Sequence, residues 1–164
     1  MKHIKKLFLL LILLLLPALT LSAQTAAELD MLLNTQELTV AASARFVLGA
    51  AQLLPGNLSG AAAQAAAYEL AQSKGWVKAG AGDIIKLKDA AFLIMNAFEL
   101  KGGLMYSLFK SPRYAYREMV YKKLIQGRAD PAMTVSGQRL LHIIGRTLVF
   151  LGENEQLDSD GGSR

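Results

Sequence analysis

Cations gathered between residues 101 and 146 are the side chains of this sequence best suited to chemistry. The stretch holds nine Lys and Arg residues but only two acids, Glu118 and Asp130. A helix end and the loop after it could present several of these cations together to an anionic polymer or to lipid headgroups. The alternative is an ordinary solvated helix face, in which some cations lie near a helix C-terminus because the helix dipole favours them there. The densest group, and our predicted ligand-binding cluster, is Arg117, Lys122, Lys123 and Arg128.

Trp76 is the second candidate for ligand binding. It follows Gly75 at the end of a predicted helix. An indole at such a corner can stack on a sugar ring, since it is apolar on its faces and polar at its N–H. It can equally serve as a packing anchor between the helix and the following loop. Both interpretations of Trp76 remain open at the level of sequence.

No arrangement of residues in the sequence predicts catalysis, a metal site or a cofactor. There is no cysteine, and the chain has only two histidines, His3 and His142. No Gly-x-Ser-x-Gly segment provides a nucleophile elbow, and no glycine-rich segment has the Lys-Ser/Thr ending of a phosphate-binding loop. We therefore predict a protein that is not an enzyme.

The first 23 residues have the pattern of a secretory signal peptide. Lys2, Lys5 and Lys6 precede an unbroken apolar run over residues 7–16, and small residues lead up to Ala23. A basic start, a short apolar core and a small-residue exit predict export and cleavage after Ala23. The expected location is the periplasm or cell envelope, and an uncleaved signal anchor is the alternative. Export makes nucleic acid an unsuitable partner.

The remaining sequence predicts an all-α bundle of five to six helices. Alanine-rich and apolar stretches are bounded by capping residues and by Gly or Pro, and no run alternates with the period of a strand. The run over residues 87–100 is apolar nearly all round, so we expect it at the centre of the bundle. Residues 24–151 form the predicted domain, and the acidic residues 152–164 are a predicted disordered tail. The expected helices are 26–33, 40–54, 60–74, 87–100, 113–125 and 135–151.

An internal repeat organises these helices. At an offset of 48 residues, the segment 67–77 matches 115–125, with Ala67-Tyr68 opposite Ala115-Tyr116. The same offset places the helix over residues 87–100 opposite the last predicted helix, and a further half-copy begins about 47 residues earlier, at Thr39. Each unit is a helix, a glycine-bearing connection and a second, more apolar helix. We predict two complete helix pairs and one truncated copy that pack on one another.

This plan resembles the S-layer homology domain, a family of secreted bacterial modules. The best-matching copy contains Leu124-Ile125-Gln126-Gly127 and then Asp130-Pro131-Ala132-Met133-Thr134. The resemblance implies a pseudo-threefold helical bundle that binds an anionic cell-wall polysaccharide through a motif arginine. The matching positions in this sequence are Val40, Leu87 and Val135, so the implied arginine is missing from every copy.

The sequence thus predicts a non-catalytic envelope module that binds an anionic cell-wall polymer or surface through its basic C-terminal half. The alternative is a structural or assembly protein whose repeat surface recognises another envelope protein. An anionic membrane surface is a further partner that the cations would suit. The sequence does not define an oligomeric state.

Overall fold

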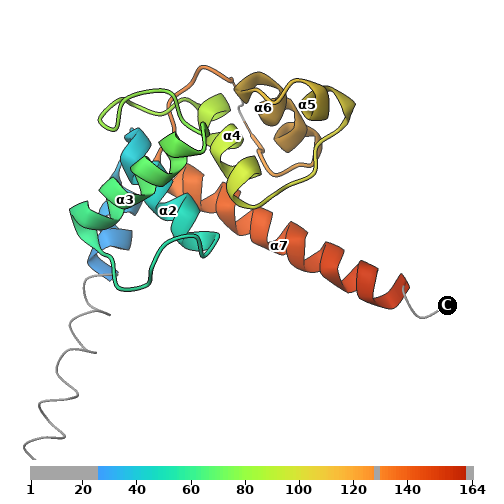
Figure 1. Ribbon diagram of the computed structural model, residues 1–164, viewed down its shortest axis with the longest axis horizontal. Coiled ribbons are helices and arrows are strands. Elements are labelled where there is room, and N and C mark those ends of the chain that lie inside the picture. The colour runs from blue at the N-terminus through green and yellow to red at the C-terminus, as the bar shows by residue number, and fades with distance from the viewer. Residues whose placement is uncertain (1–25, 128–129, 162–164) are drawn as a thin grey trace, which may run out of the picture.

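A computed structural model describes residues 26–127 and 130–161, with backbone alone over residues 155–161. These ranges are helical and contain no β-strand, which confirms the all-α prediction (Figure 1). They hold seven helices instead of five or six, because the short helix α5 was not expected. A helix over residues 26–34 precedes α2 (Val40–Ala50), α3 (Gly60–Ser73), α4 (Leu87–Ala97), α5 (Leu104–Leu108), α6 (Pro112–Tyr121) and α7 (Gly137–Gly161).

Helix α4 lies at the centre of the bundle, as its all-round apolarity predicts. Eight of its 11 residues are buried, including Phe92, Ile94 and Met95. It packs against α6 on one side and α2 on another. A helix that is apolar nearly all round has to be covered by neighbouring helices, and α6 and α2 supply such covers.

Three segments that lead into the apolar helices hydrogen-bond to one another in a closed ring. The segments span residues 35–41, 81–88 and 131–137. An isolated bridge joins Thr39 to Ile84, and a second joins Lys86 to Thr134. The third segment closes on the first, because the Leu38 N–H donates to the Val135 carbonyl at 2.9 Å. The three matching parts of the sequence repeat therefore meet in space.

The helices follow the same repeat, with one exception. Helix α3 packs against α2, and α6 packs against α4, so the first helix of each complete copy covers the second helix of the preceding copy. The helix over residues 26–34 meets the start of α7, and directly after that helix the Thr35 carbonyl accepts a hydrogen bond from the Gly137 N–H at 2.9 Å. Leu140, Ile143 and Ile144 of α7 lie in the core, and the C-terminal part of the helix extends past the other helices (Figure 1).

Glu28 connects the helix over residues 26–34 to two of its neighbours. Its carboxylate lies 3.4 Å from the guanidinium of Arg45 on α2. It also accepts a hydrogen bond from the backbone N–H of Gly60, at the start of α3. One acid thus compensates a half-buried cation and caps a helix whose first N–H groups have no partner within the helix.

Three helices end earlier than predicted, at residues without a glycine. We expected the ends at 54, 100 and 125, but α2, α4 and α6 stop at Ala50, Ala97 and Tyr121. Just beyond each end, one residue adopts a left-handed conformation: Gln52, Glu99 and Lys123 have φ angles of 57°, 51° and 58°. The glycines and the proline used to predict these ends lie further along the chain, so they did not mark them.

The last helix runs further than predicted. We expected it to end at residue 151 and a disordered tail to follow over 152–164, but the backbone is helical as far as Gly161. The predicted helix end is therefore wrong, while residues 162–164 lie outside the described ranges. Glu, Gln and Leu are good helix formers, and extending an existing helix costs far less than starting one.

Candidate functional site

A groove of about 540 Å³ runs between α7 and the segment that follows α6. Its floor is a single stripe of α7 in which Leu141, Gly145 and Val149 recur at intervals of four residues. Its wall is the turn after α6, with Lys122 and Lys123. The remaining lining residues are Leu124, Gln126, His142, Arg146, Phe150 and Glu153.

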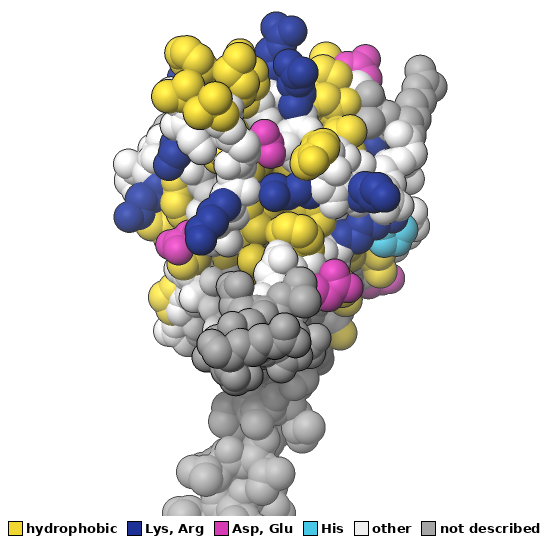
Figure 2. Space-filling view, turned by 90° about the vertical axis from the view of Figure 1, so that its right-hand side faces the viewer, with side chains coloured by type: hydrophobic (Ala, Val, Ile, Leu, Met, Phe, Trp, Pro, Cys, Tyr) yellow, Lys and Arg dark blue, Asp and Glu magenta, His cyan; other side chains and the backbone are white. Residues whose placement is uncertain are grey.

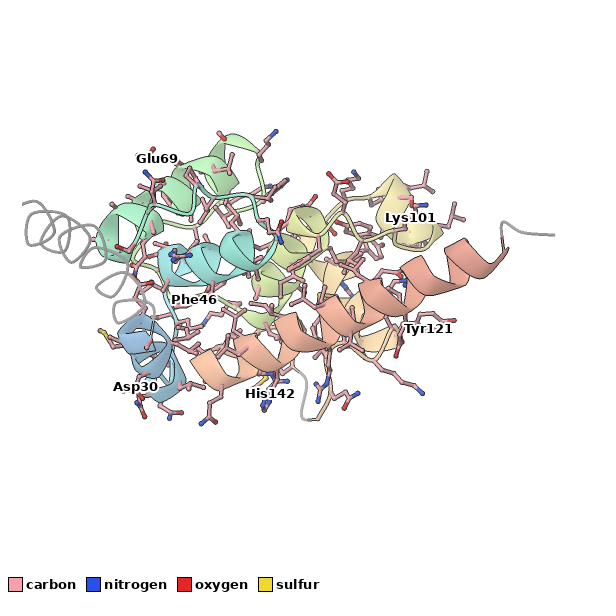
Figure 3. All side chains as sticks on the ribbon, turned by 90° about the horizontal axis from the view of Figure 1, so that it is seen from below. Asp30, Phe46, Glu69, Lys101, Tyr121 and His142 are labelled. Atoms are coloured by element: carbon pink, nitrogen blue, oxygen red, sulfur yellow. The ribbon has the colours of Figure 1, made fainter. Side chains whose placement is uncertain are left out.

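A second hollow of about 510 Å³ continues the groove toward the start of α7. Gln126, His142 and Arg146 line both hollows, and Arg139 is added in the second. We call the combined surface the basic groove and define its basic side chains as Lys122, Lys123, Arg139, His142 and Arg146. Figure 3 shows His142 on α7, pointing away from the helices behind it.

The basic residues of α7 stand where the other two copies have apolar residues. At the repeat offsets, Arg139 corresponds to Ala91 on α4 and Ala44 on α2. Both alanines are buried. Helix α7 belongs to the last copy, so no following copy supplies a first helix to cover it, and cations can occupy this part of the helix without the cost of burying a charge. The missing helix thus leaves an open, basic surface in a bundle whose matching surfaces are closed and apolar.

His142 repeats this relationship one turn further along α7. It corresponds to Ile94 and Val47, which are both buried, whereas His142 is exposed. Apolar residues of the other copies are thus replaced by basic residues at two successive turns of α7. The replacement is a feature of the open face of α7 and not of a single position.

The two lysines of the wall are held by different means. The Lys122 ammonium lies 5.2 Å from the centre of the Phe150 ring, a cation–π contact that joins the end of α6 to α7. Lys123 occupies the left-handed position after α6 with φ of 58°, and its counterpart one repeat earlier is Gly75. A side chain in that conformation costs about 1 kcal/mol relative to glycine. Lys123 is thus kept in a position where glycine would be more stable.

The structure brings together only part of the predicted cluster. Lys122 and Lys123 line the basic groove. Arg117 is exposed on α6 and lines neither hollow, so the structure does not bring it together with the two lysines in the groove. The spacing of five residues turns Arg117 to a different side of α6. Arg128 lies outside the described residues.

Trp76 lies in a separate, smaller cavity of about 170 Å³, also lined by Val77, Phe92 and Pro112. The indole is half-buried and packs against the core. Asp89 lines the same cavity, and burial raises the pKa of its carboxyl group, an effect opposed by the nearby Lys88 and Lys86. Trp76 therefore does not share a surface with the basic groove.

Reasoning from the sequence missed three residues of the groove as members of one site: Arg139, His142 and Arg146. The signal was present in the repeat itself. Each of the three stands opposite an apolar residue when the copies are aligned, which marks a face that has lost its cover.

Within the described ranges, no cluster of three His, Cys, Asp or Glu side chains could hold a metal ion. No helix in that part of the chain has both the length and the apolarity to cross a bilayer. Comparisons with family models, curated proteins and solved structures find no match to this chain.

Proposed function

We propose that this protein is a non-catalytic module, exported to the periplasm or cell envelope, that binds an anionic cell-wall polymer or surface through its basic groove. The observation that carries the proposal is the replacement of buried apolar residues by Arg139 and His142 on α7, whereas the matching helices α2 and α4 are covered by α3 and α6. If these positions on α7 served the fold alone, small polar residues would suit them as well as cations would. The gathering of cations in one groove supports an anionic ligand.

The shape of the basic groove suits a chain-like ligand. Two adjoining hollows share Gln126, His142 and Arg146, and together they follow α7 for several turns. Charged groups spaced along a polymer could meet successive cations, each contact being worth about 1 kcal/mol near an anionic surface. The apolar floor of Leu141 and Val149 suits the less polar faces of sugar rings.

The resemblance to S-layer homology modules supports a cell-wall ligand but points to another surface. The positions that match the family's motif arginine are Val40, Leu87 and Val135, and all three are buried in the core. No ligand contact is available at those positions. The basic groove is therefore proposed as a distinct surface for the same general class of ligand.

An assembly role is the second candidate. The apolar floor of the groove would also accommodate an amphipathic helix of another envelope protein. Ionic strength separates the two functions, since binding driven by charge weakens strongly in salt whereas an apolar protein interface does not.

The test is retention of the mature chain on purified cell walls at low and high salt. The variant Lys122→Glu/Lys123→Glu should weaken retention about thirtyfold or more, the equivalent of two lost contacts. Lys74→Glu/Lys78→Glu makes the same change of charge at exposed residues outside the groove and should bind like the parent. Equal retention of the two double variants would contradict the proposal.

A single substitution separates binding from folding. Lys123→Gly removes a groove cation and at the same time relieves the left-handed backbone, so it should lower retention while raising the melting temperature. Reduced retention of this variant could not be attributed to misfolding. Unchanged retention would remove Lys123 from the site.

A further inference from the structure

Helix α5 and the residue after it expose four large apolar side chains in a stretch of six residues. Leu104, Met105, Leu108 and Phe109 are 75%, 53%, 64% and 59% exposed. Single exposed apolar residues are normal on protein surfaces, but a contiguous group of this kind marks an interaction site. We call these four residues the apolar tip.

The apolar tip is held in place by its neighbours. Tyr106 is buried, and its ring meets that of Phe92 edge-on with the centres 6.5 Å apart. Gly102 allows the chain to fold closely over this ring, because a Cβ at that position would lie 2.5 Å from Tyr106. The Phe109 ring lies 6.2 Å from that of Tyr114 on α6. One side chain thus anchors α5 while the others point outward.

Cations outnumber acids around the apolar tip. The Glu118 carboxylate lies close to Gly103, and Glu99 lines the same hollow as Lys101 and Lys110. Lys101, Lys110 and Arg113 flank α5 on both sides and are exposed. The sequence has no Asp or Glu between residues 100 and 117. Figure 2 shows apolar side chains gathered beside Lys and Arg at the top of this side of the molecule. Figure 1 places α5 at the outer edge of the bundle, and Figure 3 shows Lys101 at the same edge.

We propose that the apolar tip inserts into the surface of a lipid bilayer that carries anionic headgroups. The four apolar side chains would enter the boundary between headgroups and acyl chains, and Lys101, Lys110 and Arg113 would reach the phosphates around them. A projecting edge of this composition suits a bilayer better than a protein partner, which would need a matching pocket. The proposal uses no residue of the basic groove and is independent of the proposed function.

Fluorescence can detect insertion directly, because Trp76 is the only tryptophan of the chain. A mature chain carrying Trp76→Phe and Leu108→Trp has its indole at the apolar tip. Its emission should shift to the blue when vesicles of phosphatidylcholine and phosphatidylglycerol are added. Pure phosphatidylcholine vesicles should give a smaller shift. An unchanged spectrum with the anionic vesicles would overturn the proposal and would leave a protein partner as the cover of the tip.

Co-sedimentation with the same anionic vesicles supplies the matched comparison. Leu104→Ser/Leu108→Ser/Phe109→Ser should reduce binding at least tenfold. The control Leu29→Ser/Met31→Ser/Leu53→Ser also replaces three exposed apolar residues, but away from the tip, and should bind like the parent. Circular dichroism checks the folding of both variants. Equal vesicle binding by the two triple variants would overturn the proposal. The groove variant Lys122→Glu/Lys123→Glu should reduce retention on cell walls more than it reduces vesicle binding.

Discussion

Gly137, at the start of α7, touches the segment that follows the first helix of the described chain. Its N–H donates to the Thr35 carbonyl, and a Cβ at this position would collide with the carbonyl group of Leu32. The colliding atoms belong to the backbone, so a side-chain rotation cannot relieve the contact. We predict that Gly137→Ala lowers the free energy of unfolding by about 3 kcal/mol, measured by urea denaturation.

The same helix offers a matched control. A Cβ at Gly152 would have no neighbour within 4 Å. Gly152→Ala should therefore stabilise the protein by up to about 1 kcal/mol through the higher helix propensity of alanine. If the two substitutions had the same effect, the close contact between Gly137 and Leu32 would be excluded.

The residues that end helices show where sequence reasoning stops. The end of α3 at Gly75 was predictable, because glycine adopts φ of 70° without a steric cost. Gln52, Glu99 and Lys123 adopt the same conformation with side chains that disfavour it. After Glu99 and Lys123 this conformation turns the next residue, Leu100 or Leu124, into the core, whereas Leu53 after Gln52 stays exposed. No local rule could have identified these three residues.

At the scale of elements, equivalent helices contribute equivalent core residues. Leu48 on α2, Met95 on α4 and Ile143 on α7 match at the repeat offsets, and all three are buried. Their neighbourhoods differ in composition, but each side chain fills space between copies.

We predict that Leu48→Ala, Met95→Ala and Ile143→Ala each cost about 2–5 kcal/mol and leave a single unfolding transition. Calorimetry and denaturant titration measure both quantities. Leu104→Ala, at an exposed residue, should change the stability by no more than about 0.5 kcal/mol. A near-neutral Ile143→Ala, or a second transition, would mean that the third copy does not share the core.

The helices that sequence reasoning found differ physically from the one that it missed. Helices α2, α3, α4 and α7 have long apolar or alanine-rich runs, while α6 begins at Pro112 and is followed by Gly127, and these patterns are readable without a structure. Helix α5 is five residues long and buries one side chain, Tyr106. A segment this short has no periodicity to detect, and its apolar composition would ordinarily predict burial. Its exposure could come only from the three-dimensional arrangement.

At the scale of the whole molecule, three copies close a ring, and within the described ranges the first helices of the two complete copies, α3 and α6, act as covers. The ring of segments 35–41, 81–88 and 131–137 needs all three copies, whereas α3 and α6 cover only α2 and α4. The basic groove occupies the place where a third cover would lie. The sequence repeat predicted the unequal number of helices through its truncated first copy. The position of the groove could not be predicted, because it depends on which face of α7 remains open.

The proposed export concerns the whole chain, because cleavage after Ala23 would remove the signal peptide and leave the helix over residues 26–34 in place. Helix 26–34 contributes Leu32 to the core, and Glu28 bonds to Arg45. Cleavage after Ala23 would leave these contacts intact. Mass spectrometry of the protein recovered from the envelope should find Gln24, or a residue within a few positions, at the N-terminus. A recombinant chain starting at Gln24 should keep the stability of that native form, whereas one starting at Glu37 should lose several kcal/mol with the Leu32 and Glu28 contacts. Recovery of an intact Met1 from a soluble cytoplasmic fraction would contradict export.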